Sequence, residues 1–597
     1  MPRACLSASI AGVLDVTITV AGEAGQGIRL AGETLTRLFA RDGYHLFAWP
    51  DVMSRIRGGH NLTRIRVADE PVSSVAAQTN LLLALDDHSV EAHVAEMVPD
   101  GVILAEGEGE PEGRDRAQLV RVPFTKLAEA RGGAKLYASA VALGAMTALV
   151  GQPRKALDAL LKATFARKGR EVVKANLNCA KVGFDAVDEK FRRQCPCRVP
   201  ARGGRPKLLL NGSEAVGFGA LCAGVRVFAG YPMSPATGVM EYLAARQAEF
   251  GLVMEQAEDE IAAVNIALGA SWAGARAMTA TSGGGFALMV EGLGLAGMAE
   301  LPLVIVVAQR SGPATGFPTR HEQAELLYAL NAAQDEFPRF VFTPGTVEEA
   351  AYATARAFEL AERFQVPAIV LTDQQLADSF TTVDEFDRTR LRVRAVVETT
   401  LTPPSPSRGR ELKGGGVRLP AGRRYELTAS GVSPRVRPGE PGRVVRSMGS
   451  EHDEDGHSTE NAANRVRMQN KRLRKTAGMA EVFGVVEAWP DEPVRTLVAC
   501  FGSTRGPVRE AVAALREQGR EVGMLFLPEP WPFPFVEFET RLAGCRRLVT
   551  VEQNSTGQLG RLIARATRRR PDAEILRYDG RPWRAAELVE RIGEAAG

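Results

Sequence analysis

The sequence of 597 residues has few cysteines and no pattern that would hold a metal cluster. Its seven cysteines include no C-x-x-C pair and no ferredoxin-type run, so we do not expect this chain to bind an iron–sulfur cluster by itself. The one close pair is Cys195-Pro196-Cys197, which we interpret as two thiols in a linker rather than as a metal site.

The sequence also lacks a strong excess of charge and a long hydrophobic run. The 74 Lys and Arg residues nearly balance the 71 Asp and Glu residues, which gives no electrostatic argument for nucleic acid or an anionic membrane. Asp15 interrupts the hydrophobic amino-terminal segment, and no run near about 20 apolar residues follows. We therefore expect a cytoplasmic protein that binds neither nucleic acid nor a membrane.

Short β-rich segments alternate with helical patterns along most of the chain, which predicts an α/β fold with largely parallel sheets. The length suits about three to four domains. We expect three α/β units in series, at residues 10–193, 207–385 and 481–597. A linker or extended region is expected at 386–480. It contains a basic insert at 402–445, of which the Pro/Gly-rich stretch 402–424 should be mobile.

The middle unit is the most regular part of the sequence. Strand patterns at 225–229, 276–282 and 303–308 each lead into a polar turn and then a helix. Because ligands collect at the carboxyl ends of parallel strands, we expect a site at this edge of the sheet. The candidate residues that follow these strands are Tyr231, Pro232, Ser234, Thr281, Ser282, Gly283 and Arg310.

Glu260 is the strongest candidate for acid–base chemistry. It begins a helix that is small and apolar on most faces, IAAVNIALGASWAGA, and such a helix is expected to be buried. A carboxyl group at its first turn would be poorly solvated and suited to sharing a proton. The alternative is that it only complements the helix dipole, an explanation that applies more readily to its neighbours Glu258 and Asp259.

A glycine loop near the amino terminus contains Gly22, Gly25 and Gly27 between a strand and a helix, where a phosphate can bind. Its spacing differs from the G-x-G-x-x-G of dinucleotide sites, which argues against a nicotinamide coenzyme. The loop is either a tight packing turn or an anion or coenzyme site. Arg57 could assist the second role or lie in a solvated loop.

Taken in order, these motifs resemble the alpha subunit of 2-oxoacid:ferredoxin oxidoreductases, of the 2-oxoglutarate type with a gamma domain fused at the amino terminus. The resemblance rests on YPMSPAT, EDEIAAVNIALGASWAGARAMTATSGGG, GLAGMAELPLVIVVAQRSGPATGFPTRHEQAELL and the carboxyl-terminal VEQNSTGQLGRL and YDGRPW. The sequence departs from the family pattern in that Ser234 stands for Thr, Gly284 for Pro, and Glu23-Ala24 for Gly-Gly.

The resemblance implies a gamma domain, a pyrimidine-binding thiamine-diphosphate domain and a transketolase C-terminal-like domain. It also implies a beta subunit that carries the diphosphate site, Mg²⁺ and a [4Fe–4S] cluster, in an (αβ)₂ assembly. Glu260 would hydrogen-bond N1′ of the cofactor's pyrimidine and promote loss of the C2 proton. Ser234 and Arg310 would orient the substrate, while Tyr231, Pro232, Thr281, Ser282 and Gly283 would contact the cofactor.

The expected reaction is oxidative decarboxylation of a 2-oxo acid, with 2-oxoglutarate as the substrate, coenzyme A as the acyl acceptor and ferredoxin as the electron acceptor. The distal carboxylate of 2-oxoglutarate needs a second cation, for which Arg320 and His321 are the candidates. Two alternatives are a nicotinamide-dependent dehydrogenase built on the first glycine loop and a non-catalytic scaffold of the same fold. The loop spacing argues against the first, and the presence of Glu260 against the second.

Overall fold

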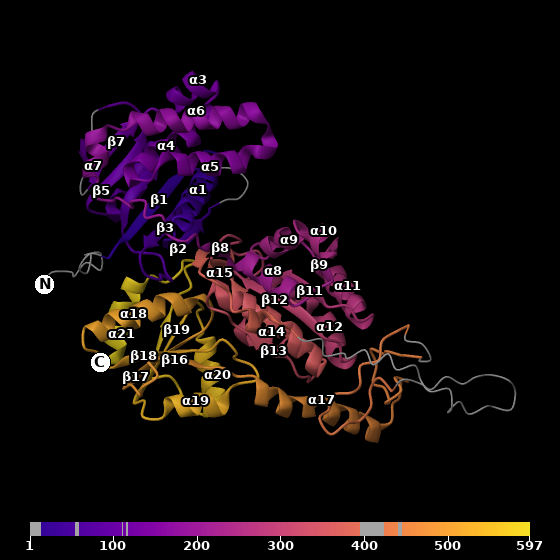
Figure 1. Cartoon of the computed structure of the whole chain (residues 1–597). Helices are drawn as coiled ribbons and strands as arrows, with labels where there is room; N and C mark the ends of the chain where they lie inside the picture. Colours follow the sequence, from indigo (N-terminus) through magenta and orange to yellow (C-terminus); the bar gives the residue numbers. More distant parts are fainter. Residues whose placement is uncertain (1–12, 54–58, 110–111, 115–116, 394–422, 440–443) are drawn as a thin grey trace. The chain divides into compact units, whose positions relative to one another are not determined.

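The computed structural model describes residues 13–53, 59–109, 112–114, 117–393, 423–439 and 444–597 (Figure 1). These residues form two compact lobes. The first lobe is bounded by Met1–Asn211, Asp378–Glu385 and Trp583–Gly593. The second lobe is bounded by Gly212–Ala377, Phe386–Pro582 and Glu594–Gly597.

The first lobe contains a mixed sheet of nine described strands. The strand order is β6-β7-β5-β4-β1-β3-β2-β15-β8. Strand β1 pairs parallel to β4 but antiparallel to β3, and β3 is antiparallel to β2, so the sheet is less parallel than the alternating pattern predicted. The strands are β1 (Asp15–Glu23), β2 (His45–Asp51), β3 (His60–Ala68), β4 (Thr79–Ala84), β5 (Met97–Glu106), β6 (Glu112–Arg114), β7 (Ala117–Val122), β8 (Leu208–Asn211) and β15 (Phe380–Val383).

The helices of the first lobe pack closely enough that glycine is required at two positions. A Cβ on Gly144 would lie 2.0 Å from the carbonyl oxygen of Ala180, and one on Gly183 would lie 1.9 Å from that of Val141. The backbones of α4 and α6 therefore touch (Figure 1). The helices are α1 (Ile28–Arg41), α2 (Asp87–His93), η1 (Val94–Glu96), α3 (Phe124–Gly132), η2 (Lys135–Tyr137), α4 (Ala138–Val150), α5 (Arg154–Phe165), η3 (Ala166–Lys168), α6 (Arg170–Ala186), α7 (Glu189–Gln194) and α21 (Ala585–Ala596).

The second lobe begins with a six-stranded parallel sheet in the order β10-β9-β11-β12-β14-β13. Strands β11, β12 and β14 are buried along their whole length, as expected for parallel strands covered on both faces. The strands are β9 (Val227–Gly230), β10 (Val253–Gln256), β11 (Ala277–Thr281), β12 (Leu303–Gln309), β13 (Phe340–Phe342) and β14 (Pro367–Asp373).

The helices of this region follow the predicted alternation with one difference. The sequence predicts a turn between the strand at 276–282 and the helix after it, but Gly283, Gly284 and Gly285 form the first turn of α12. The helices are α8 (Gly212–Cys222), α9 (Thr237–Ala244), α10 (Gln247–Phe250), α11 (Glu260–Trp272), α12 (Gly283–Met298), α13 (Leu326–Asn331), α14 (Val347–Phe364), α15 (Gln374–Asp378) and α16 (Arg388–Leu391). Within the described ranges, no single helix is long and apolar enough to cross a membrane.

A five-stranded sheet, in the order β16-β18-β17-β19-β20, completes the second lobe. Its core continues into that of the six-stranded sheet, and the Val341 amide donates to the Trp531 carbonyl over 2.9 Å. The three sheets confirm the predicted α/β class. The elements are β16 (Glu487–Trp489), β17 (Thr496–Cys500), η5 (Gly502–Thr504), α18 (Arg505–Glu517), β18 (Val522–Phe526), α19 (Phe535–Leu542), β19 (Arg547–Glu552), α20 (Gln558–Thr567) and β20 (Ala573–Leu576).

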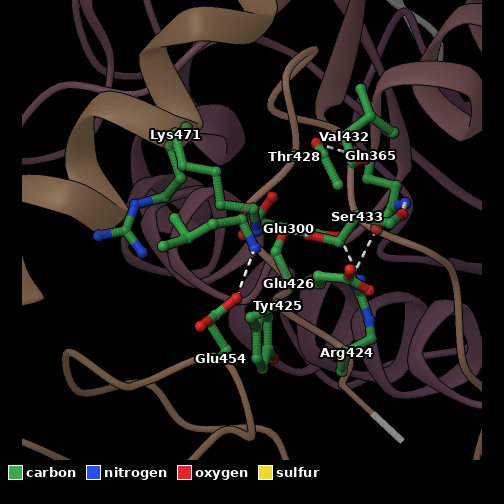
Figure 2. Close-up of polar contacts among 12 residues, drawn as sticks. Glu300, Gln365, Arg424, Tyr425, Glu426, Thr428, Val432, Ser433, Glu454 and Lys471 are labelled. Atoms are coloured by element: carbon green, nitrogen blue, oxygen red, sulfur yellow. Dashed lines mark hydrogen bonds and ion pairs between the residues drawn. The ribbon is translucent and has the colours of Figure 1, made fainter.

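The described part of the region 386–480, which we expected to be a linker, belongs to the second lobe and packs within it through buried charges. Helix α17 (Ala462–Val482) places the Nζ atoms of Lys471 and Lys475 each 2.6 Å from a carboxylate oxygen of Glu300. Arg424 donates to the Glu300 carbonyl oxygen over 2.6 Å (Figure 2). All four side chains are almost fully buried. Most of the basic insert lies outside the described residues.

Candidate functional site

The structure brings most of the predicted site residues to one edge of the six-stranded sheet. The carboxyl ends of the four neighbouring parallel strands are at Gly230, Gln256, Thr281 and Gln309. The predicted residues of the middle unit other than Arg320 lie at or just beyond one of these ends, as the strand pattern implied. The edge combines a carboxylate, hydroxyl groups and a guanidinium, which suits a polar ligand.

Glu260 is the first residue of α11, and its side chain is not needed to cap the helix. The cap is provided by Asp259, whose carboxylate accepts a hydrogen bond from the Ala262 amide over 2.7 Å. Glu260 is only 3% exposed, and its Oε1 has no hydrogen-bond partner in the described part of the chain. A buried carboxyl oxygen without a partner is costly, so the geometry favours a role for Glu260 toward a ligand over simple helix capping.

The first turn of α12 lies directly against this carboxyl group. A Cβ on Gly285 would be 2.6 Å from Glu260 Oε1, so only glycine leaves room for the carboxyl group. The hydroxyls of Thr281 and Ser282 are also buried and lack a hydrogen-bond partner among the residues described. A buried acid beside unpartnered hydroxyls can bind a heteroaromatic ring that both donates and accepts hydrogen bonds, such as an aminopyrimidine.

Arg310 follows β12 and reaches across to the loop after β9. Its Nη1 donates to the carbonyl oxygen of Ser234 over 2.7 Å, so the observed link is to the Ser234 main chain rather than to its hydroxyl. Burial lowers the pKa of the Arg310 guanidinium, with an opposing effect from Glu325. In the same loop, Tyr231 and Pro232 are exposed.

The two candidates for a distal carboxylate differ in their surroundings. His321 is 1% exposed, its Nδ1 lies 3.6 Å from Asp373 Oδ1, and burial lowers its pKa. Such a histidine is an internal polar group, not a free cation for a substrate, so it is a poor candidate. Arg320 is half-buried and packs against Gly580 of the YDGRPW segment. A Cβ added to Gly580 would lie 3.0 Å from the Cβ of Arg320, so the two residues are in close contact.

The carboxyl-terminal sheet holds the segment after the Arg310 loop, an arrangement that sequence reasoning missed. Gln558 accepts a hydrogen bond from the Leu327 amide over 2.9 Å and donates to the Ala324 carbonyl over 2.6 Å. Asn554 donates to the Gln323 carbonyl over 3.2 Å, and the Gln323 amide donates to the Gln553 carbonyl over 2.7 Å. The only signal for these contacts is the polar run VEQNSTGQ, which follows a strand.

The glycine loop of the first lobe shows features of a tight packing turn and also features of a ligand-binding loop. A Cβ on Gly27 would lie 2.8 Å from Ser139 Cβ, which is a packing constraint. Gly25 has φ of 104° and open space around it, so its backbone is accessible to a ligand. Gly22 lies within β1, against the side chain of Gln26. Arg57 lies outside the described residues.

Three family profiles match the chain in series. Residues 17–186 match the family described as "Pyruvate ferredoxin/flavodoxin oxidoreductase". Residues 218–471 match "Pyruvate flavodoxin/ferredoxin oxidoreductase, thiamine diP-bdg". Residues 495–588 match "Pyruvate:ferredoxin oxidoreductase core domain II".

A curated relative decides the family. The 2-oxoacid:ferredoxin oxidoreductase 2, subunit alpha, of Aeropyrum pernix is 30% identical over an alignment that covers 98% of this chain and 98% of that protein. This chain belongs to the 2-oxoacid:ferredoxin oxidoreductase alpha-subunit family. The 2-oxoglutarate synthase subunit KorA of Methanothermobacter marburgensis is 32% identical, over an alignment that covers 64% of this alpha subunit and 97% of that protein.

A solved structure supports the same assignment. The 2-oxoglutarate:ferredoxin oxidoreductase from Magnetococcus marinus, with 2-oxoglutarate, coenzyme A and succinyl-CoA bound, matches with a TM-score of 0.85 and 30% identity. The match covers 98% of this alpha subunit and 100% of that chain. The predicted family and the prediction of an oxidoreductase subunit are confirmed, and the thiamine diphosphate-binding profile includes the whole edge described above.

Proposed function

We propose that this alpha subunit serves the oxidative decarboxylation of 2-oxoglutarate, with coenzyme A as acyl acceptor and ferredoxin as electron acceptor. The observation that carries the proposal is the buried, unpartnered carboxyl group of Glu260 at the same sheet edge as Arg310, among the residues that the structure describes. Two of the similar proteins, from Methanothermobacter marburgensis and Magnetococcus marinus, are named as 2-oxoglutarate enzymes.

The residues present fit the pyrimidine of thiamine diphosphate, which when bound would supply a carbon nucleophile and an electron sink. Glu260 would hold a proton at the pyrimidine N1′, which satisfies its free oxygen. Thr281 and Ser282 would supply hydrogen bonds, and Gly283 would let the backbone approach closely. Tyr231 and Pro232 would line the same space from the loop after β9.

Substrate binding in this proposal depends on two arginines. Arg310 would bind the carboxylate next to the 2-oxo group, because a guanidinium suits bidentate carboxylate recognition. Ser234 would fix the position of Arg310 through the carbonyl contact that the structure contains. Arg320 would bind the distal carboxylate of 2-oxoglutarate, a role left to it by the buried state of His321.

We further propose a beta subunit that carries the diphosphate site, Mg²⁺ and a [4Fe–4S] cluster, joined in an (αβ)₂ assembly. The described residues include no group of His, Cys, Asp and Glu side chains suited to a metal. Beside Glu260, helices α11 and α12 expose the apolar side chains of Ile261, Ile266 and Leu288, which are 39–50% exposed. Exposed apolar side chains on the two helices that carry the site support a partner that covers them.

Purification with and without the beta partner tests the proposal. We expect the chain alone to contain no iron and to be inactive. The coexpressed complex should reduce a viologen dye with 2-oxoglutarate and coenzyme A. Activity of the lone chain with NAD⁺ would favour the nicotinamide alternative, and a complex without activity on any 2-oxo acid would overturn the proposal.

A further inference from the structure

A second carboxyl group, that of Glu325, lies at the same edge of the sheet. Glu325 directly precedes α13, yet its side chain makes no capping hydrogen bond to that helix. Its amide donates to Gln309 Oε1 over 3.0 Å, and Gln309 Nε2 in turn donates to the Thr372 carbonyl over 3.2 Å. Glu325 is therefore anchored through the last residue of β12, next to Arg310.

The Glu325 carboxyl group packs onto the same helical turn as Glu260. A Cβ on Gly283 would lie 2.5 Å from Glu325 Oε1, as one on Gly285 would lie 2.6 Å from Glu260 Oε1. The Oε2 atom of Glu325 is buried and has no hydrogen-bond partner within the described ranges. Two carboxyl groups thus lie over one glycine turn, each with a buried oxygen that lacks a partner among these residues.

The charges around Glu325 favour its neutral form. Burial and the neighbouring carboxylate of Glu322 raise the pKa of Glu325 to about 8, although Arg310 has an opposing effect. A neutral carboxyl group can donate a hydrogen bond, whereas an ionised one can only accept.

We propose that Glu325 is a second acid of this site, which in its protonated form donates a hydrogen bond to the 2-oxo acid held by Arg310. Its neutral state also leaves the charge of Arg310 available to the substrate carboxylate. This inference rests on the proposed function. When the pH rises enough to ionise Glu325, its carboxylate attracts Arg310 and repels the anionic substrate, so KM increases while kcat changes little.

The test measures KM and kcat for 2-oxoglutarate against pH in the assembled complex. For the wild type, KM should rise by about tenfold per pH unit above the pKa of Glu325, as for one titrating group. Glu325→Gln keeps a donor and has no charge, so its KM should stay near the neutral-pH value throughout. Glu325→Leu lacks the donor, so its KM should be raised at every pH. Glu322→Gln removes a repulsive charge and should move the rise to lower pH.

Two further measurements keep the result unambiguous. An infrared difference spectrum between neutral and alkaline pH should show a protonated carboxyl band that disappears in Glu325→Gln. The exposed Glu336→Gln should follow the wild type in every assay. The inference is overturned if Glu325→Gln retains the alkaline rise in KM, or if Glu325→Leu behaves like Glu325→Gln. A wild-type complex that is inactive with 2-oxo acids at every pH would overturn the proposed function instead, and the infrared band would still test the protonation of Glu325.

Discussion

Replacing Glu300 by glutamine would remove the carboxylate that neutralises two buried lysines of α17, Lys475 and Lys471. Figure 2 shows Glu300 and Lys471. Lys471 and Lys475 are 0% and 1% exposed, so neither can reach water without movement of the helix. Glutamine has nearly the same shape and can still accept a hydrogen bond from one lysine. The substitution therefore tests the charge of Glu300 and not its volume.

The expected loss of stability follows from the buried charges and, separately, from the pKa of Glu300. Removing one partner of a buried ion pair costs about 3–5 kcal/mol, because the other charge remains buried and uncompensated. Burial raises the pKa of Glu300, but Lys475 and Lys471 outweigh this effect and lower it from 4.5 to about 2. That shift corresponds to roughly 3 kcal/mol of stabilisation of the folded state. This contribution is complete above the unfolded-state pKa of 4.5 and is lost as the pH falls toward 2.

Urea unfolding of the second lobe at neutral pH is the appropriate assay. We expect the midpoint to fall with an unchanged slope, equivalent to about 3–5 kcal/mol, and the difference from wild type to shrink in acid. Glu492→Gln, in the more exposed pair with Arg516, should change stability by less than about 1 kcal/mol. The triple variant Glu300→Leu, Lys471→Met and Lys475→Met should regain most of the loss. A loss below about 1 kcal/mol for Glu300→Gln would refute the reasoning.

Four further outcomes are expected in the assembled complex. Glu260→Gln should slow hydrogen–deuterium exchange at C2 of bound thiamine diphosphate by at least about tenfold, since acid–base contributions are about 10²–10⁴-fold, and unchanged exchange would exclude a catalytic role. Arg310→Ala should lower kcat/KM by about ten- to a hundredfold, because charge-assisted hydrogen bonds worth about 1.5–3 kcal/mol are lost. If the kinetics of the variant equal those of the wild type with several 2-oxo acids, Arg310 does not belong to the site. Arg320→Ala should raise KM for 2-oxoglutarate more than for pyruvate, and an equal effect on both would assign it no role at the distal carboxylate. Gln558→Leu should lower kcat/KM by about tenfold or more, since two hydrogen bonds at about 1 kcal/mol each are lost; wild-type kinetics would show that the segment holds its position without them.

The strands of the second lobe were predictable because buried strands leave a recognisable pattern of apolar residues in the sequence. Parallel strands covered on both faces appear as continuous apolar runs, and β9, β11 and β12 lie close to the predicted segments. Strand direction in the first lobe was not predictable, because the pattern of a strand is the same whether its neighbour runs parallel or antiparallel. The antiparallel pairing of β1 with β3 therefore appeared only in the structure.

The candidate site was predictable where a residue follows a strand, as Glu260 and Arg310 do. It was not predictable where contacts join distant segments. The hydrogen bond between Gln558 and Leu327 spans 231 residues, and no local pattern encodes it. The glycine at position 283, inside a helix, is also explained by a contact with a distant segment. Glycine disfavours helices, but the Glu325 carboxyl group occupies the space that a side chain at this position would need.

Helix α17 shows how a charged segment can be mistaken for a linker. Its sequence is rich in arginine and lysine, and lysines are almost never fully buried unless they are paired. The pairing partner, Glu300, lies in the connection between α12 and β12. Helix α12 begins at the glycines that contact Glu260 and Glu325, and β12 ends beside Arg310, so the ion pairs hold the far ends of the two elements that carry the site. A cluster that fixes both elements at one end limits how far their other ends can move, which gives the buried charges a physical connection to the geometry of the site.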